Sequence, residues 1–200
     1  MKWLSSYKKF SDEELMSFIS GGDLAYLKEL YNRYSKKLLY YFYRMLGGDE
    51  ETAQDFLQDV FLKIIEKADQ FNLNKNFSVW IFTIASNLCK NEYRRLKVRE
   101  ITQTESNLDY YEQLNPTDQI QLINQNDFER ALLNELAKMD PEQSSTFILR
   151  YQENLSINEI GEILSCSPGT VKSRIFYITK KLASRLSEFD PNIIKDLSHG

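Results

Sequence analysis

The side chains best suited to a chemical role lie between Leu164 and Ser187, a stretch without an acidic residue. Seven cationic or hydroxyl-bearing side chains gather on or beside one face of a helix predicted there: Thr170, Lys172, Ser173, Arg174, Tyr177, Lys180 and Lys181. Cations neutralise phosphates, and polar groups bond to phosphates or base edges. This face therefore suits a nucleic acid, and the chemistry that it predicts is binding.

Two short helices joined by a tight turn must position this face. Ser156 and Glu159 form a predicted capping box that starts a helix over residues 157–164. Ser167 caps the next helix, whose first residue is Pro168, where a missing N–H is tolerated. Four apolar residues recur with a helical period on its inner side: Val171, Ile175, Ile178 and Leu182. The pattern predicts a helix-turn-helix that offers its second helix to DNA. A hairpin that serves only for packing is the alternative, and the one-sided positive charge favours DNA.

A second candidate surface runs along a long helix predicted over residues 77–99. Five apolar side chains are expected to face inward: Phe77, Trp80, Ile81, Ile84 and Leu88. The outer stripe combines hydroxyl, amide, aromatic and cationic groups: Val79, Thr83, Ser86, Asn87, Lys90, Tyr93, Arg94 and Lys97. From residue 90 to 99, five basic residues accompany one acidic residue, which suits a nucleic-acid strand. The alternative is a solvated helix face with Tyr93 half buried.

A third surface lies on the preceding helix, which Asp49 caps and which extends to about Ala68. Opposite its apolar side, acidic and amide side chains surround one leucine: Asp55, Gln58, Asp59, Leu62 and Glu66. A solvated acidic face is the ordinary interpretation of such residues. Leu62 supports the other interpretation, because an apolar residue ringed by carboxylates and an amide is typical of a surface that binds a partner helix.

The composition excludes several classes of protein. The sole histidine, His199, lies next to the C-terminus, and Cys89 and Cys166 have no partner spacing for a metal. Because the usual general base, the metal clusters and a glycine-rich phosphate loop are all missing, we expect no enzyme and no cofactor. The N-terminus lacks a signal-peptide core, and the longest apolar run, residues 38–43, is too short to span a bilayer. We therefore expect a cytoplasmic protein with no membrane insertion.

The sequence predicts an all-α fold, because no stretch alternates with period two for long enough to form a strand. Further helices are expected to start at Ser11, at Asp23 (ending near Leu46), at Asp127 and at Asp140. Residues 101–125 carry four acidic residues and no lysine or arginine, which indicates an extended acidic linker. The chain thus divides into two small helical domains, at 1–100 and 127–187, joined by a linker at 101–126 and followed by a tail at 188–200.

Three motifs occur together in a specific order and spacing: DEETAQDFLQDVFLKI, NFSVWIFTIASNLCKNEYRR and ALLNELAKMDPEQSSTFILRYQENLSINEIGEILSCSPGTVKSRI. In this arrangement the chain closely resembles the extracytoplasmic-function (ECF) group of bacterial sigma factors, in the sigma-70 family. The resemblance covers about residues 11–99 and 127–186. It implies a protein that binds bacterial core RNA polymerase, directs it to a promoter and helps to open the duplex.

The resemblance implies a role for each surface. The segment that docks on the polymerase clamp is matched by Asp55, Gln58, Asp59, Leu62 and Glu66. The part that reads and melts the minus-ten element is matched by a polar loop and the stripe after it: Asn72, Asn74, Lys75, Asn76, Thr83, Asn87, Lys90, Tyr93 and Arg94. In the family a non-template base is typically flipped into a pocket there, and asparagine side chains can bond to its edge. The reader of the minus-thirty-five element is matched by Thr170, Lys172, Ser173, Arg174, Tyr177 and Lys180, and the acidic linker by the segment threaded through the RNA exit path.

Two departures concern DNA binding. Family members often carry arginine near the position of Tyr177, and tyrosine cannot replace the bidentate bond of arginine to guanine. The formal net charge of −4 predicts that the polymerase supplies much of the electrostatic attraction to DNA.

The expected partners are core polymerase, promoter DNA and an anti-sigma factor or another recruiting protein. Two alternatives remain. A stand-alone helix-turn-helix regulator would not need the surface around Leu62. An anti-sigma-type or adaptor protein would not need the basic stripe from Lys90 to Lys97.

Overall fold

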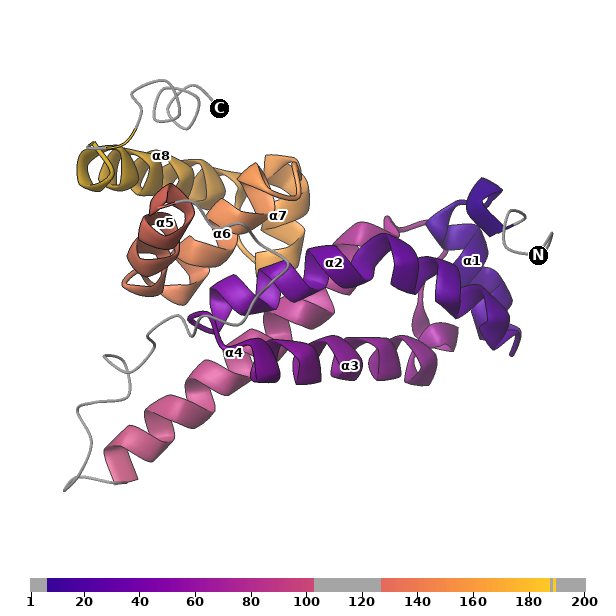
Figure 1. Cartoon of the computed structure of the whole chain (residues 1–200). Helices are drawn as coiled ribbons and strands as arrows, with labels where there is room; N and C mark the ends of the chain where they lie inside the picture. The colour runs from indigo at the N-terminus through magenta and orange to yellow at the C-terminus, as the bar shows by residue number, and fades with distance from the viewer. Residues whose placement is uncertain (1–6, 103–126, 188, 190–200) are drawn as a thin grey trace.

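The computed structural model describes residues 7–102, 127–187 and 189, and every regular element among them is helical (Figure 1). The N-terminal domain contains α1 (Asp12–Ser20), α2 (Leu27–Met45), α3 (Glu50–Glu66) and α4 (Phe77–Thr102). The C-terminal domain contains α5 (Asp127–Ala137), α6 (Pro141–Tyr151), α7 (Ile157–Leu164) and α8 (Pro168–Arg185). Three short 3₁₀ turns accompany the first domain: η1 (Tyr7–Lys9), η2 (Leu24–Tyr26) and η3 (Ala68–Gln70). The predicted all-α fold with two helical domains is confirmed; nearly all of the expected acidic linker, and of the tail, lies outside the described residues.

Local capping signals set most of the helix starts. Five predicted caps form, each with its side chain bonded to a first-turn N–H: Ser11, Asp49, Asp140, Ser156 and Ser167. The start of α2 was predicted wrongly. Asp23 accepts a hydrogen bond from the Ala25 N–H at 3.1 Å and begins η2 instead, so that α2 starts only at Leu27.

Helix α4 is covered over a wider arc than its sequence period predicts. Phe77 and Ile81 are buried as expected, whereas Trp80, Ile84 and Leu88 are only half-buried. The most deeply covered side continues through Phe82, Ala85, Ser86 and Cys89. Ser86 was predicted on the outer stripe and is 2% exposed, so this assignment was wrong. The cause is long-range packing, because α4 packs against α2 and α3 and also against α7.

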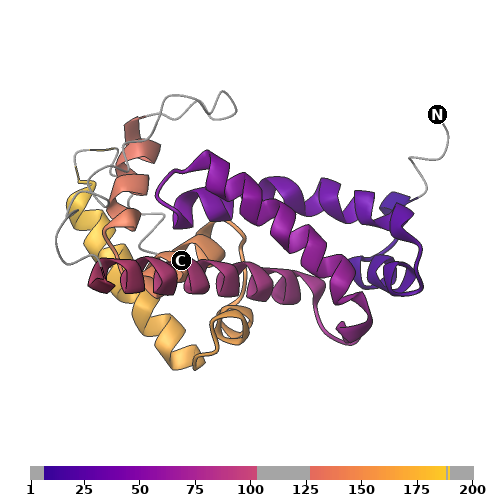
Figure 2. The same cartoon turned by 90° about the horizontal axis from the view of Figure 1, so that it is seen from below.

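The two domains share one continuous core in what we call the closed arrangement. Helix α7 packs against α4, while α5 and α6 pack against α2 (Figures 1 and 2). At the centre of this interface the Tyr41 hydroxyl lies 2.8 Å from the Ser145 hydroxyl, and both residues are buried. Nearer the edge, the Lys37 ammonium lies 3.6 Å from the largely buried carboxylate of Glu153.

Candidate protein and nucleic-acid interfaces

The acidic face of α3 is open to solvent. Its predicted members are all exposed: Asp55, Gln58, Asp59, Leu62 and Glu66, which we call the α3 surface. Leu62 is 55% exposed although it is a large apolar side chain. Ile65, one turn away and 39% exposed, extends the apolar part of this surface and was missed in the sequence. Figure 1 shows α3 on the side of α2 away from the C-terminal domain, so the closed arrangement leaves the α3 surface accessible.

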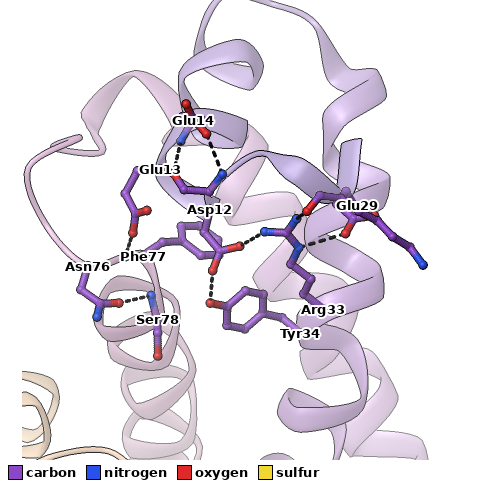
Figure 3. A network of polar contacts seen from close by, with 11 residues as sticks. Asp12, Glu13, Glu14, Glu29, Arg33, Tyr34, Asn76, Phe77 and Ser78 are labelled. Atoms are coloured by element: carbon purple, nitrogen blue, oxygen red, sulfur yellow. Dashed lines mark hydrogen bonds and ion pairs between the residues drawn. The ribbon is translucent and has the colours of Figure 1, made fainter. Parts of the chain in front are cut away.

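The loop of residues 71–76, which precedes α4, is anchored at both ends. Phe71 is buried at its start, and at its end the Asn76 side-chain oxygen accepts a hydrogen bond from the Ser78 N–H at 2.8 Å (Figure 3). Between these anchors the predicted base-binding side chains are exposed: Asn72, Asn74 and Lys75. The Asn76 side-chain amide also donates to Glu159 of α7 at 3.2 Å. The C-terminal domain therefore occupies part of the hydrogen-bonding capacity of this loop.

The predicted stripe on α4 is largely engaged within the chain. The Thr83 hydroxyl donates to a carbonyl of the preceding turn at 2.7 Å, and the Tyr93 hydroxyl donates to the Met45 carbonyl. The Lys90 ammonium lies 3.5 Å from the Leu164 carbonyl, at the end of α7 where the carbonyls lack helical partners and the helix dipole is negative. Three predicted residues of the stripe are exposed: Asn87, Arg94 and Lys97.

The turn between α7 and α8 passes so close to Gly161 of α7 that a side chain at this position would clash with the backbone of the turn. A Cβ atom placed there would lie 2.8 Å from the Cys166 carbonyl oxygen, closer than real contacts of that kind. Ser165 closes α7 in the left-handed conformation, with φ of 54°. The predicted helix-turn-helix is therefore present. It depends on Gly161, whose role was not predicted from the sequence.

The outward face of α8 carries four of the predicted residues: Lys172, Ser173, Tyr177 and Lys180. It also carries Phe176, which is 61% exposed and packs edge-on against Tyr177 with ring centroids 5.4 Å apart. Phe176 was missed, although it lies four residues after Lys172 and four before Lys180 and therefore shares their face. Thr170 is half-buried, and its hydroxyl lies 2.9 Å from that of Ser167 in the cap of α8. We call these outward residues the α8 surface.

Arg174 points away from the α8 surface. Its guanidinium forms an ion pair with Glu142 of α6, and a second nitrogen lies 3.6 Å from the Cys166 sulfur. The side chain of Arg174 is 20% exposed. Its position follows from spacing, since it lies three residues after Val171 and four before Ile178, both of which are buried. Arg174 thus ties α8 to α6 and to the turn.

The structure offers few groups for other chemistry. Within residues 7–102, 127–187 and 189, no three histidine, cysteine or acidic side chains lie together as metal ligands would. Both cysteines are free thiols. In the same part of the chain, no helix combines the length and apolar character needed to cross a membrane.

Comparison with known proteins places two sigma-70 segments on this fold. The family model described as Sigma-70 region 2 matches residues 30–99, and that described as Sigma-70, region 4 matches residues 129–182. The ECF RNA polymerase sigma factor SigW of Bacillus subtilis is 29% identical over 180 residues, which cover 85% of this chain and 94% of SigW.

Two solved structures share the fold over most of the chain. CnrH, solved in complex with the cytosolic domain of CnrY, superposes with a TM-score of 0.65 at 21% identity, covering 90% of this chain and 99% of CnrH. The sigma factor RpoE of Bartonella quintana, solved with the anti-sigma factor NepR, superposes with a TM-score of 0.62 at 24% identity, covering 80% and 96%.

Proposed function

This chain belongs to the ECF group of the sigma-70 family, and we propose that it binds bacterial core RNA polymerase, directs it to specific promoters and helps to melt the DNA for initiation. Its relatives are sigma factors, which are not enzymes. Within the proposal, residues 1–100 form the region 2 domain, 101–126 the linker and 127–187 the region 4 domain, followed by a tail.

The exposure of Leu62 is the observation that carries the proposal. A leucine 55% exposed among carboxylates favours a partner protein at the α3 surface. A stand-alone DNA-binding regulator would have no need of that surface. An adaptor that only bound protein would have no need of the exposed lysines and aromatic rings on α8. The presence of both surfaces in one chain supports the sigma-factor function over either alternative.

Each surface receives one role in this proposal. The α3 surface binds the clamp of the polymerase. The loop of residues 71–76 and the stripe on α4 bind the minus-ten element, and the α8 surface, now including Phe176, binds the minus-thirty-five element. Arg174 supports this last contact by holding α8, because its guanidinium is committed to Glu142. The acidic linker occupies the RNA exit path, where its carboxylates replace RNA phosphates.

DNA binding at the minus-ten element requires the closed arrangement to open. Lys90 contacts the end of α7 and Asn76 contacts Glu159, so the C-terminal domain competes with DNA for these side chains. The α3 and α8 surfaces are already accessible in the closed arrangement. We therefore expect polymerase binding at α3 to come first and separation of the domains to follow. Residues 103–126 connect the domains and, at about 3.3 Å per residue, can span on the order of 80 Å when extended.

We further propose that an anti-sigma factor or another recruiting protein controls this chain. CnrH and RpoE were each solved in complex with a partner protein, CnrY and NepR respectively. An anti-sigma partner that covered the α3 surface would block binding of the polymerase. One that held the domains together would instead block binding of DNA to the stripe on α4.

The test is binding of the chain to purified core polymerase, measured with Leu62→Arg and with the control Leu73→Arg. Both leucines are about half exposed, so neither substitution should change the melting temperature. Loss of a hot-spot residue costs about 2 kcal/mol or more, so Leu62→Arg should weaken binding by roughly 30-fold or more if Leu62 is the apolar centre of the interface, as proposed. Leu73→Arg, outside the α3 surface, should bind normally. Normal binding by Leu62→Arg would contradict the assignment.

A further inference from the structure

The N-terminus of α4 receives a cap from a distant part of the chain. The Phe77 N–H donates to a carboxylate oxygen of Glu13 in α1 at 3.0 Å, across 64 positions of sequence (Figure 3). Helix α4 has no acidic residue in its own first turn. Because the first N–H groups of a helix lack internal partners and carry the positive end of its dipole, a carboxylate is the group best suited to this place. The next N–H, that of Ser78, is bonded by Asn76.

Hydrogen bonds made by the preceding residue, Asp12, hold α1 and therefore Glu13 in place. Its neighbour Asp12 accepts hydrogen bonds from Arg33 at 2.7 Å and from the Tyr34 hydroxyl, both in α2 (Figure 3). Arg33 also donates to Glu29 at 2.9 Å and to the Lys8 carbonyl at 3.2 Å. Burial and the bond to Asp12 raise the pKa of Tyr34, which keeps its hydroxyl a hydrogen-bond donor. Helix α1 is therefore held against α2, and this fixes the position from which Glu13 contacts α4.

The loop of residues 71–76 ends immediately before Phe77, whose N–H bonds to Glu13. At the other end of the loop, the Phe71 ring lies 5.8 Å from that of Phe77 and 5.1 Å from that of Trp80. The exposed side chains Asn74 and Lys75 lie between these two attachments. Glu13 thus sets where the end of the loop sits relative to the first turn of α4.

We propose that Glu13 is a positioning residue for minus-ten recognition: by bonding the Phe77 N–H, it fixes the loop that receives a non-template base. This inference rests on the proposed function of the loop. Base capture depends on hydrogen bonds aimed at a base edge, and a well-placed set of such bonds discriminates by roughly tenfold or more. A displaced loop loses that discrimination even when the rest of the domain stays folded.

The experiment measures base preference in the assembled holoenzyme. Core polymerase with the full chain is incubated with a pool of single-stranded non-template DNA randomised across the minus-ten positions, and bound strands are sequenced. Glu13→Ala should flatten the preference at one or more positions by about tenfold. Glu13→Gln retains an acceptor oxygen and should keep most of the preference. Glu14→Ala, which removes the neighbouring carboxylate that accepts the Ser11 N–H in the α1 cap, should leave the preference unchanged.

A purely structural role for Glu13 predicts a different result. Loss of folded protein lowers the total amount of bound DNA but leaves the ratio between preferred and disfavoured bases intact. An unchanged ratio in Glu13→Ala therefore overturns the proposal, as does equal flattening in Glu14→Ala. If the unsubstituted holoenzyme shows no preference at any randomised position, the minus-ten function of the loop fails, and the positioning role fails with it.

Discussion

Replacing Ser145 with alanine should open the closed arrangement without unfolding either domain. Ser145 in α6 is the partner that the C-terminal domain offers to the Tyr41 hydroxyl of α2, at 2.8 Å in a site closed to solvent. Removing it leaves a buried hydroxyl poorly satisfied in the closed state, whereas water satisfies the same group once the domains separate. The substitution therefore weakens closure selectively.

The magnitude follows from the surroundings of the hydroxyl. A buried polar group that loses its partner costs about 1–3 kcal/mol. The nearby Ser86 of α4 offsets part of the rise that burial causes in the pKa of Tyr41, so its hydroxyl can take over part of the interaction, which favours the lower half of that range. A cost of about 1–2 kcal/mol raises the population of the open form by roughly 5- to 30-fold.

The thiol of Cys89 provides the assay. Cys89 is 1% exposed and lies in a pocket whose walls include Ser86 and Lys90 from α4 and Glu142, Ser145 and Leu164 from the C-terminal domain. Burial raises the pKa of this thiol, which suppresses the reactive thiolate until the pocket opens. In a Cys166→Ser background, the rate of modification by a disulfide reagent then reports the open population, and Ser145→Ala should raise that rate by the same 5- to 30-fold.

The adjacent serine is a matched control. The Ser144 hydroxyl donates to the Leu136 carbonyl at 2.7 Å inside the C-terminal domain, so Ser144→Ala should lower the stability of that domain with much less effect on Cys89. The double variant Tyr41→Phe with Ser145→Ala removes both hydroxyls. Its open population, and hence its rate of Cys89 modification, should be lower than that of Ser145→Ala alone. An unchanged modification rate in Ser145→Ala, or an equal increase in Ser144→Ala, would refute this reasoning.

Three further predictions concern single side chains. Lys172→Ala should weaken holoenzyme binding to minus-thirty-five DNA and reduce the salt slope by about one, with the melting temperature unchanged, because Lys172 is exposed. Arg174→Ala should instead lower the melting temperature by about 2–4 °C, since it breaks a half-buried ion pair worth about 1 kcal/mol. Burial raises the pKa of Glu153, and Lys37 partly offsets this rise. The folded protein therefore gains stability as the pH falls from above the raised pKa toward the ordinary value of 4.5, and loses that stability as the pH rises again. Glu153→Gln should therefore raise the melting temperature at neutral pH, with a gain that shrinks below the raised pKa; a gain independent of pH would contradict the assignment.

Local signals predicted the fold well. Capping residues such as Ser156 and Ser167 act within one helical turn, so the sequence alone locates the helix starts that depend on them. Asp23 shows the limit of that reasoning, because its cap serves a 3₁₀ turn whose sequence signal does not differ from that of an α-helix.

The candidate sites were predicted less completely, for two different reasons. Ser86 is buried and Lys90 half-buried beside residues of the C-terminal domain, and no periodicity within α4 carries information about a domain that packs from elsewhere in the chain. Arg174 and Phe176 are different, because their spacing from buried and exposed neighbours on α8 was sufficient to place them. The contact between Glu13 and the first turn of α4 joins segments 64 positions apart and became visible only in three dimensions.

Transcription from a promoter library by purified core polymerase, with and without this chain, tests the central claim most directly. We expect transcripts that appear only when the chain is present and whose templates share two upstream motifs, one for each DNA-binding surface. Binding to the polymerase with no promoter-specific transcript would contradict the sigma-factor function and favour an adaptor. Absence of binding to the polymerase would contradict the role of the α3 surface as well.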